Sequence, residues 1–171
     1  MKERTGTITM NGGPLTLLGK ELKTGDPAPD VELVANDLSF VKLSSFRGKI
    51  IIIASVPSLD TAVCDMETRR FNEEAIRLGE DVQILTISMD LPFAQKRWCG
   101  NAGVDRVITL SDHREAAFGT AYGVLIKEIH LLARAVFILD REQRIRYIQV
   151  VKEISREPDY DAILKAIRKL L

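Results

Sequence analysis

The sequence predicts an α/β fold in which a central mixed β-sheet is flanked by helices. Residues 50–56 and 82–89 are nearly continuous apolar runs, the pattern of strands buried on both faces of a sheet. Each run is followed by a segment with the features of a helix. The last third of the chain changes to two adjacent strands and one helix, so we expect parallel and antiparallel pairing in one sheet.

Length and composition indicate a single globular domain that spans residues 1–171. Hydrophobic residues make up 46% of the chain, and 24 basic side chains balance 24 acidic ones. This balance argues against a nucleic-acid partner, and the apolar runs are too short for a membrane span. The N-terminal residues lack the apolar stretch of a secretory signal, so we expect a cytoplasmic location.

The N-terminal third should contain a hairpin and two short strands. Residues 6–10 and 15–18 flank an Asn-Gly-Gly-Pro turn, a combination that favours a β-hairpin. Residues 31–34 and 40–43 are predicted strands on either side of a turn at residues 36–37. The continuous apolar run that follows is the predicted central strand.

The middle of the chain carries two predicted helices, each with one cysteine. Asp60 or Thr61 can cap the first helix, and one face of it is defined by residues spaced at +4, +3, +4 and +3: Cys64, Thr68, Phe71, Ala75 and Leu78. Asp90 can cap the second, short helix, which has Pro92 in its first turn and ends near Gly100. Cys99 lies at the end of that helix.

The C-terminal part completes the predicted sheet. Residues 106–110 are a predicted strand, and residues 114–122 a short helix. A hairpin is expected over residues 134–139 and 144–151, and Pro158 opens a final amphipathic helix. Alternating strands and helices followed by an antiparallel pair are the arrangement of a thioredoxin-like fold.

Cys64 is the most informative residue for function. It lies in the first turn of a helix, directly after a buried strand. Free backbone N–H groups and the positive end of the helix dipole favour an anion there. The thiol should therefore ionise readily, and the thiolate is the nucleophilic form of cysteine.

Reduction of a peroxide needs little more than such a thiolate. The sulfur attacks one oxygen, and nearby donors must align the peroxide and stabilise charge as the O–O bond breaks. Thr61 can direct its hydroxyl toward the sulfur of Cys64, and Pro57 can shape and shield the loop. An arginine would also help, but spacing alone does not select one among the many arginines.

Cys99 can react with the product formed on Cys64. Attack on a peroxide leaves a sulfenic acid, which a second thiol converts into a disulfide. A disulfide requires Cα atoms about 4.4–6.8 Å apart. Because the two cysteines lie on separate predicted helices, we expect local unwinding before they join.

Several ordered segments resemble one known family. Residues 57–64 match the P-x-x-x-T-x-x-C signature of the peroxiredoxins. The N-terminal hairpin resembles the thiol peroxidase subgroup, and so do the segments T-R-R-F-N at 68–72, D-L-P-F-A-Q at 90–95, W-C-G at 98–100 and A-R-A-V at 133–136. The resemblance covers essentially the whole chain. It departs from the subgroup at Ala62, where proline is usual.

The resemblance implies an atypical two-cysteine peroxiredoxin that reduces hydrogen peroxide and alkyl hydroperoxides. Cys64 would be the peroxidatic cysteine and Cys99 the resolving one, joined in an intramolecular disulfide that thioredoxin reduces. Thr61 and Arg134 would act in catalysis and bind the peroxide, and Pro57 would shape the pocket. The resemblance also implies a homodimer and no cofactor.

Other functions stay open at this point. A thioredoxin-like oxidoreductase normally carries C-x-x-C, which residues 64–67 lack. A redox-sensing binding module or a structural domain could have the same fold. Cys64 could be a small apolar core residue, Thr61 only a helix cap, and Arg134 only the partner of a carboxylate. The two cysteines and two histidines show no zinc-ligand spacing, so we expect no metal.

Overall fold

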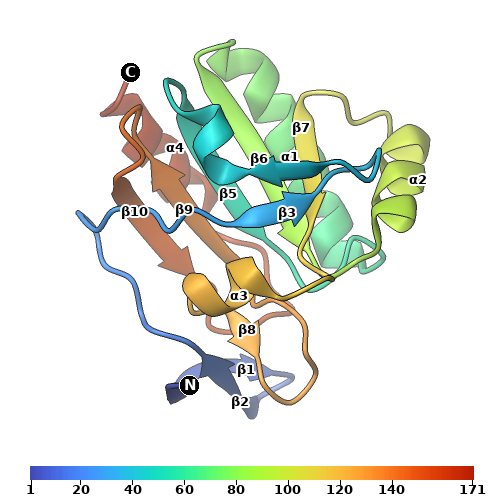
Figure 1. Cartoon of the computed structure of the whole chain (residues 1–171), viewed down its shortest axis with the longest axis vertical. Coiled ribbons are helices and arrows are strands. Elements are labelled where there is room, and N and C mark those ends of the chain that lie inside the picture. Colours follow the sequence, from blue (N-terminus) through green and yellow to red (C-terminus); the bar gives the residue numbers. More distant parts are fainter.

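A seven-stranded mixed sheet forms the centre of the computed structural model, which describes residues 1–171 (Figure 1). Helices lie on both faces of this sheet, and a three-stranded sheet lies at one end of the molecule. The elements in chain order are β1 (Glu3–Met10), β2 (Gly13–Leu18), β3 (Glu32–Val34), β4 (Phe40–Lys42), a 3-10 helix (Leu43–Phe46), β5 (Ile50–Ser55), α1 (Ala62–Leu78), β6 (Val82–Ser88), α2 (Pro92–Ala102), β7 (Val107–Ser111), α3 (Ala117–Ala121), β8 (Leu125–Ile126), β9 (Ala135–Leu139), β10 (Ile145–Val150) and α4 (Tyr160–Arg168).

The large sheet has the strand order β10-β9-β5-β6-β7-β3-β4. β5, β6 and β7 are parallel, whereas β9 is antiparallel to β5, and β3 is antiparallel to β7. The predicted α/β fold with a central mixed sheet is therefore confirmed. Because β5 and β6 are parallel, the loops that lead into α1 and α2 leave the sheet at the same edge.

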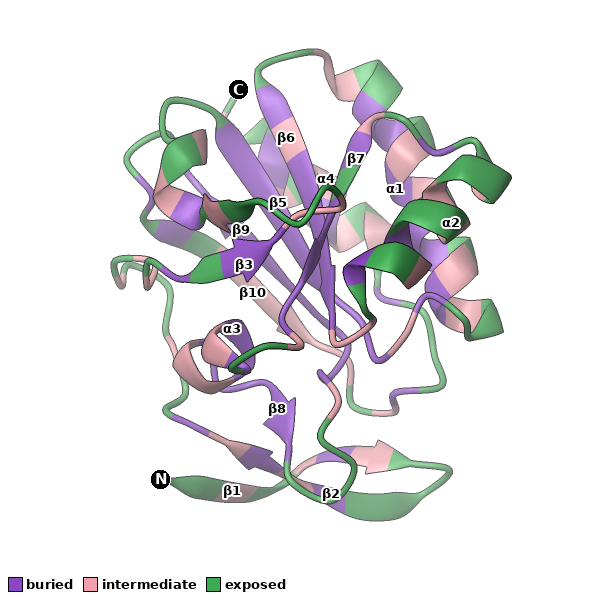
Figure 2. Ribbon diagram, turned by 45° about the vertical axis from the view of Figure 1, so that its right-hand side comes forward, coloured by how far each residue is buried: buried purple, intermediate pink, exposed green.

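Two apolar clusters fill the two faces of the large sheet. Ile50 and Ile52 of β5 face the cluster that includes α1 and α4, whereas Ile51 and Ile53 face the cluster that includes α3 and the small sheet. Every residue of β5 is buried as a result (Figure 2). This two-sided burial explains why the sequence shows a continuous apolar run instead of alternation. None of the helices is long and apolar enough to cross a membrane.

The N-terminal hairpin, β1 and β2, forms the small sheet together with β8. Ile8 and Leu17 are fully buried in the larger apolar cluster, which anchors the hairpin to the rest of the molecule. The backbone of Thr9 also accepts a hydrogen bond from the N–H of Ile154 at 3.0 Å. The predicted hairpin is confirmed, and its tip is held next to the segment that follows β10.

Several predicted helix boundaries were wrong. Asp90 does not cap α2: Leu91 is the capping residue and makes no side-chain bond there. α2 continues to Ala102, where Gly103 ends it in a left-handed conformation (φ 67°). α3 covers only Ala117–Ala121, because the buried carboxylate of Asp112 binds the N–H groups of Phe118 and Gly119.

Two elements had no sequence prediction. The 3-10 helix directly after β4 occupies part of the segment expected to lead into the central strand. β8 is only two residues long and exists through its pairing with β2. Such a short strand leaves no periodic pattern that could be recognised in the sequence.

We expect Gly119→Ala to lower the free energy of unfolding by about 1–3 kcal/mol. A Cβ at this buried position would lie 2.7 Å from Leu132 Cδ2 and 3.1 Å from Leu125 Cβ. Gly100→Ala is the matched control, since nothing lies within 4 Å of a Cβ there. Urea unfolding measures both variants. A Gly119→Ala protein as stable as Gly100→Ala would contradict the tight packing.

Candidate active site

The loop between β5 and α1 places Cys64 at the start of a helix. Thr61 caps α1 in an extended conformation, and its Oγ1 accepts a hydrogen bond from the N–H of Cys64 at 3.4 Å. The same hydroxyl donates to the carbonyl of Ser58 at 3.0 Å. Of the two predicted caps, Thr61 is therefore the one used, and its hydroxyl bonds to the backbone of Cys64 instead of the sulfur.

Cys64 is completely buried in a small apolar cluster with Val56 and Leu59, and Trp98 packs against this cluster. Apolar surroundings disfavour charge on a sulfur. One group opposes this effect: Nη2 of Arg134 donates a hydrogen bond to Cys64 Sγ at 3.3 Å. Of all the arginines in the chain, the structure brings Arg134 to the thiol.

Besides Cys64 Sγ, two other acceptors hold the guanidinium of Arg134. Nε and Nη2 donate to the carbonyl of Ile154 at 3.0 and 2.8 Å, and Nη1 donates to Glu67 Oε2 at 2.6 Å. Arg134 directly precedes β9, whose first residue, Ala135, pairs with Ser55 at the end of β5. Strand pairing therefore sets the arginine beside the loop that carries Cys64.

Glu67 lies one helical turn after Cys64 and shares the buried face of α1. Burial raises the pKa of Glu67 to about 7, although the charge of Arg134 acts in the opposite direction. Its Oε1 is buried and has no hydrogen-bond partner. Burial also disfavours the charge of Arg134, but Glu67 and Cys64 outweigh this effect and raise its pKa. Arg134 therefore stays charged at neutral pH.

A cavity of about 310 Å³ opens beside this group. Its walls come from the hairpin tip, the loop before α1, the segment before β9 and the segment after β10, with the lining residues Met10, Asn11, Pro57, Thr61, Ala62, Val63, Ile129, Leu131, Arg134, Ile154 and Ser155. A small molecule in this cavity would meet the guanidinium of Arg134 among mainly apolar walls. Pro57, Thr61 and Arg134 thus line one cavity.

Asp90 fixes the loop that precedes α1. Its carboxylate accepts hydrogen bonds from Ser58 Oγ at 2.7 Å, Leu59 N–H at 2.8 Å and Ser88 Oγ at 2.8 Å. These bonds join the loops after β5 and β6 at their shared edge of the sheet. Asp90, which the sequence predicted as a helix cap, therefore holds the loop that carries Thr61 in place.

Cys99 does not contact Cys64. Both thiols are free, and Cys99 Sγ lies 3.4 Å from Thr109 Oγ1 on β7. Cys99 lines a separate groove of about 360 Å³, which Cys64 does not reach. The structure therefore brings Cys64, Thr61, Pro57 and Arg134 together and leaves Cys99 apart.

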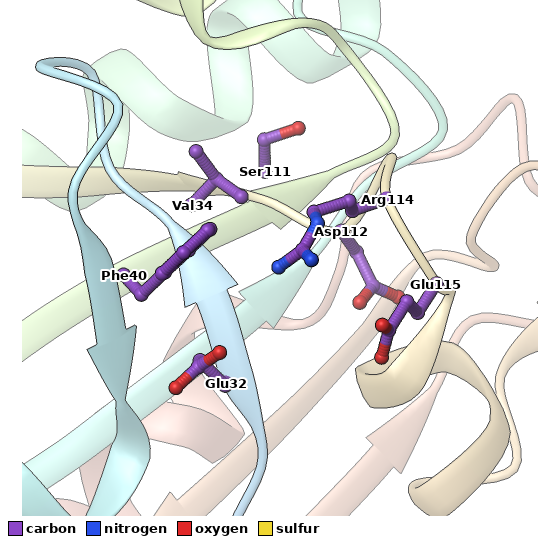
Figure 3. A pocket seen from close by; sticks show the side chains of 7 residues that line it. All are labelled: Glu32, Val34, Phe40, Ser111, Asp112, Arg114 and Glu115. Carbon is purple, nitrogen blue, oxygen red and sulfur yellow. The ribbon is translucent and has the colours of Figure 1, made fainter.

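A much smaller hollow of about 20 Å³ lies between β3 and the segment after β7 (Figure 3). The guanidinium of Arg114 lies over the ring of Phe40 there, 4.6 Å from its centre. The hollow has room for about one water molecule, and neither cysteine lines it. We therefore place the candidate site at the cavity beside Arg134.

The sequence reasoning missed two parts of this site. Glu67 follows Cys64 at a spacing of i+3, which places both on one helix face, so this spacing could have revealed it. The role of the Ile154 carbonyl could not be predicted from the sequence. Every residue has a backbone carbonyl, and only the fold decides which one lies next to Arg134.

Comparisons with known proteins agree on one family. The Redoxin family model matches residues 23–164. Thiol peroxidases of Oceanobacillus iheyensis and Bacillus subtilis are 57% and 52% identical to this chain, covering 95% and 96% of it and 98% of each relative. A crystal structure of a peroxiredoxin-like protein from Aquifex aeolicus superposes with a TM-score of 0.91 at 42% identity, covering 98% of this chain and 99% of that one.

We expect the free energy of unfolding to fall as pH rises from about 4.5 to about 7. In this window Glu67 ionises in the unfolded chain but keeps its proton in the folded one, because its folded pKa is the higher. The contribution of this one group is at most about 1.4 kcal/mol per pH unit.

Urea unfolding across this pH range measures the slope. Glu67→Gln should remove the contribution, whereas Glu73→Gln, at an exposed position of the same helix, should keep it. A Glu67→Gln slope equal to that of the parent chain would show that this carboxyl is already ionised at low pH.

Proposed function

Because this chain belongs to the Redoxin family and, within it, to the thiol peroxidase subgroup of the peroxiredoxins, we propose that Cys64 is the thiol that attacks the peroxide. The chain is a thiol-dependent peroxidase. The observation that carries the assignment to Cys64 is its hydrogen bond from the buried guanidinium of Arg134, beside a cavity that can admit a small substrate.

In the first step the Cys64 thiolate attacks one oxygen of the peroxide. The O–O bond breaks, and its electron pair leaves with the second oxygen as hydroxide or alkoxide, which takes up a proton to form water or an alcohol. Cys64 is oxidised to a sulfenic acid, and the peroxide is reduced. Arg134 stabilises negative charge on the sulfur before attack and on the peroxide oxygens during it.

Thr61 and Pro57 serve the same step from the loop before α1. Both line the cavity next to Arg134. The Thr61 hydroxyl can exchange its bond with Ser58 for one with a peroxide oxygen, while it continues to accept from the N–H of Cys64. Pro57 has no backbone N–H and forms a rigid part of the wall.

In the second step Cys99 resolves the sulfenic acid. Its thiolate attacks Cys64 Sγ, the S–O bond breaks, and the oxygen leaves as water after it gains a proton. The resulting disulfide is returned to two thiols by a dithiol reductant of the thioredoxin type. Because Cys64 is buried and Cys99 faces another groove, α1 and α2 must loosen before the disulfide forms.

The cavity supports two classes of substrate, hydrogen peroxide and alkyl hydroperoxides. Its apolar walls include Ile129, Leu131 and Met10, which can contact an alkyl chain. Hydrogen peroxide needs only the polar end near Arg134. A reducing compartment such as the cytoplasm would keep both cysteines as thiols between turnovers, and a homodimer is the assembly expected in solution.

We expect Cys64→Ser to lose all peroxide consumption, because a serine hydroxyl cannot form a sulfenic acid. Cys99→Ser should consume one equivalent of peroxide per chain and stop with Cys64 as the sulfenic acid, and excess peroxide should consume further equivalents only by oxidising that acid further. A thioredoxin-coupled assay and mass spectrometry of the quenched protein measure both outcomes.

Thr109→Ser is the matched control, since it keeps a hydroxyl beside Cys99 and leaves both thiols in place. Normal turnover by Cys64→Ser would refute the assignment of the attacking thiol. Sustained thioredoxin-dependent turnover by Cys99→Ser would refute only the assignment of the resolving thiol.

We expect Arg134→Lys to slow the reaction of Cys64 with peroxide by about 10- to 100-fold. A compact ammonium cannot reach Cys64, Glu67 and the Ile154 carbonyl together, as the planar guanidinium does. Stopped-flow peroxide consumption at limiting peroxide measures this step. Arg146→Lys, in a half-exposed ion pair with Asp140, should leave the rate unchanged. Equal rates for both variants would mean that another donor activates the sulfur.

A further inference from the structure

A cluster of three side chains joins α1 to α2 next to the apolar cluster that contains Cys64. The indole Nε1 of Trp98 donates a hydrogen bond to Asp65 Oδ1 at 2.7 Å, and Arg69 Nε donates to Asp65 Oδ2 at 2.9 Å. Arg69 Nη1 also donates to the carbonyl of Ala102, the last residue of α2, at 3.1 Å. A charged acceptor makes such bonds stronger than neutral ones. We call these side chains the Asp65–Arg69–Trp98 cluster.

Trp98 lies on the Cys64 side of α2. It packs against the small apolar cluster of Val56, Leu59 and Cys64. The next residue, Cys99, faces Thr109 and a different groove. Consecutive residues of an α-helix point about 100° apart. Trp98 therefore occupies the side of α2 that Cys99 would have to present to Cys64.

We propose that Asp65 is a positioning residue that holds Trp98 against Cys64 and thereby sets the rate at which Cys99 reaches the oxidised sulfur. This inference rests on the proposed function, because it concerns the step from sulfenic acid to disulfide. Asp65 touches no reacting atom and acts only through Trp98 and Arg69.

The geometry of a disulfide gives the physical reason. The Cα atoms of the two cysteines must come within about 4.4–6.8 Å, so α2 must rotate or unwind and Trp98 must leave its place. Contacts that stabilise the docked helix lower the fraction of open molecules, and they slow disulfide formation by the same factor. A slower resolving step leaves the sulfenic acid exposed to a second peroxide for longer.

Two variants test the contact in different ways. Asp65→Ala removes the acceptor, whereas Trp98→Phe removes the donor without changing the charge near Cys64. Each should speed disulfide formation from the sulfenic acid by about tenfold, the effect of losing one charge-assisted hydrogen bond. Because both act on one contact, the double variant should be no faster than the faster single variant. Glu73→Ala removes an exposed carboxylate from the same helix and should match the parent chain.

The experiment starts from reduced full-length protein mixed with substoichiometric hydrogen peroxide. Acid quenching at millisecond intervals, followed by alkylation and mass spectrometry, gives the disulfide fraction, and trapping with dimedone gives the sulfenic acid. Peroxide loss in the same samples gives the first step separately. In turnover with reductant, the peroxide concentration that inactivates half of the enzyme should also rise about tenfold in both variants.

Faster resolution in both single variants, with no further gain in the double variant, would support the inference. Disulfide formation at the parent rate or slower, with the first step intact, would overturn it and leave the proposed function standing. A parent chain that reduces peroxide but never forms the Cys64–Cys99 disulfide would overturn both this inference and the resolving role of Cys99.

Discussion

One buried cation determines how the rest of the site is arranged. Only 2% of Arg134 is exposed, and removing a guanidinium from water costs several kcal/mol unless its N–H groups find acceptors. Those acceptors come from α1 and from the segment after β10, and the arginine itself stands at the start of β9. The hydrogen bonds of this one charged group therefore hold three distant parts of the chain together. Cys64 is one of the groups that these parts enclose.

In the proposed mechanism the same enclosure favours the first step and opposes the second. A water-excluded site strengthens the interaction between Arg134 and sulfur, which favours attack on a peroxide. The proposed disulfide with Cys99 would, in contrast, need Cys64 to leave that site. Asp90 holds the loop before α1, and Trp98 of α2 packs against the apolar cluster that contains Cys64. In the proposed cycle these contacts would favour the attack on the peroxide and oppose the formation of the disulfide.

Sequence patterns predicted those parts of the protein whose causes are local. The four consecutive isoleucines of β5 indicate a buried strand from the sequence alone. Thr61 is a residue type that often caps a helix, and it stands just before the helix that carries Cys64. The partners of Arg134 and Asp90 could not be predicted in this way, because Ile154 and Ser58 are far from them in sequence and are brought near by strand pairing. Asp90 illustrates the difficulty well: its position suits a helix cap, yet tertiary contacts take its carboxylate elsewhere. Arg134 itself was indicated only by family resemblance.

The N-terminal hairpin contributes to the candidate site although it lies outside the region that the family model matches. The matched region begins at residue 23, after both strands of the hairpin. Yet Met10 and Asn11 wall the cavity, and Thr9 binds the N–H of Ile154, whose carbonyl holds Arg134. The hairpin therefore supplies part of the cavity wall and also supports the backbone segment that holds Arg134. A side-chain change at Met10 or Asn11 would alter the cavity wall alone, whereas a shift of the backbone at Thr9 would also displace the segment whose carbonyl holds Arg134.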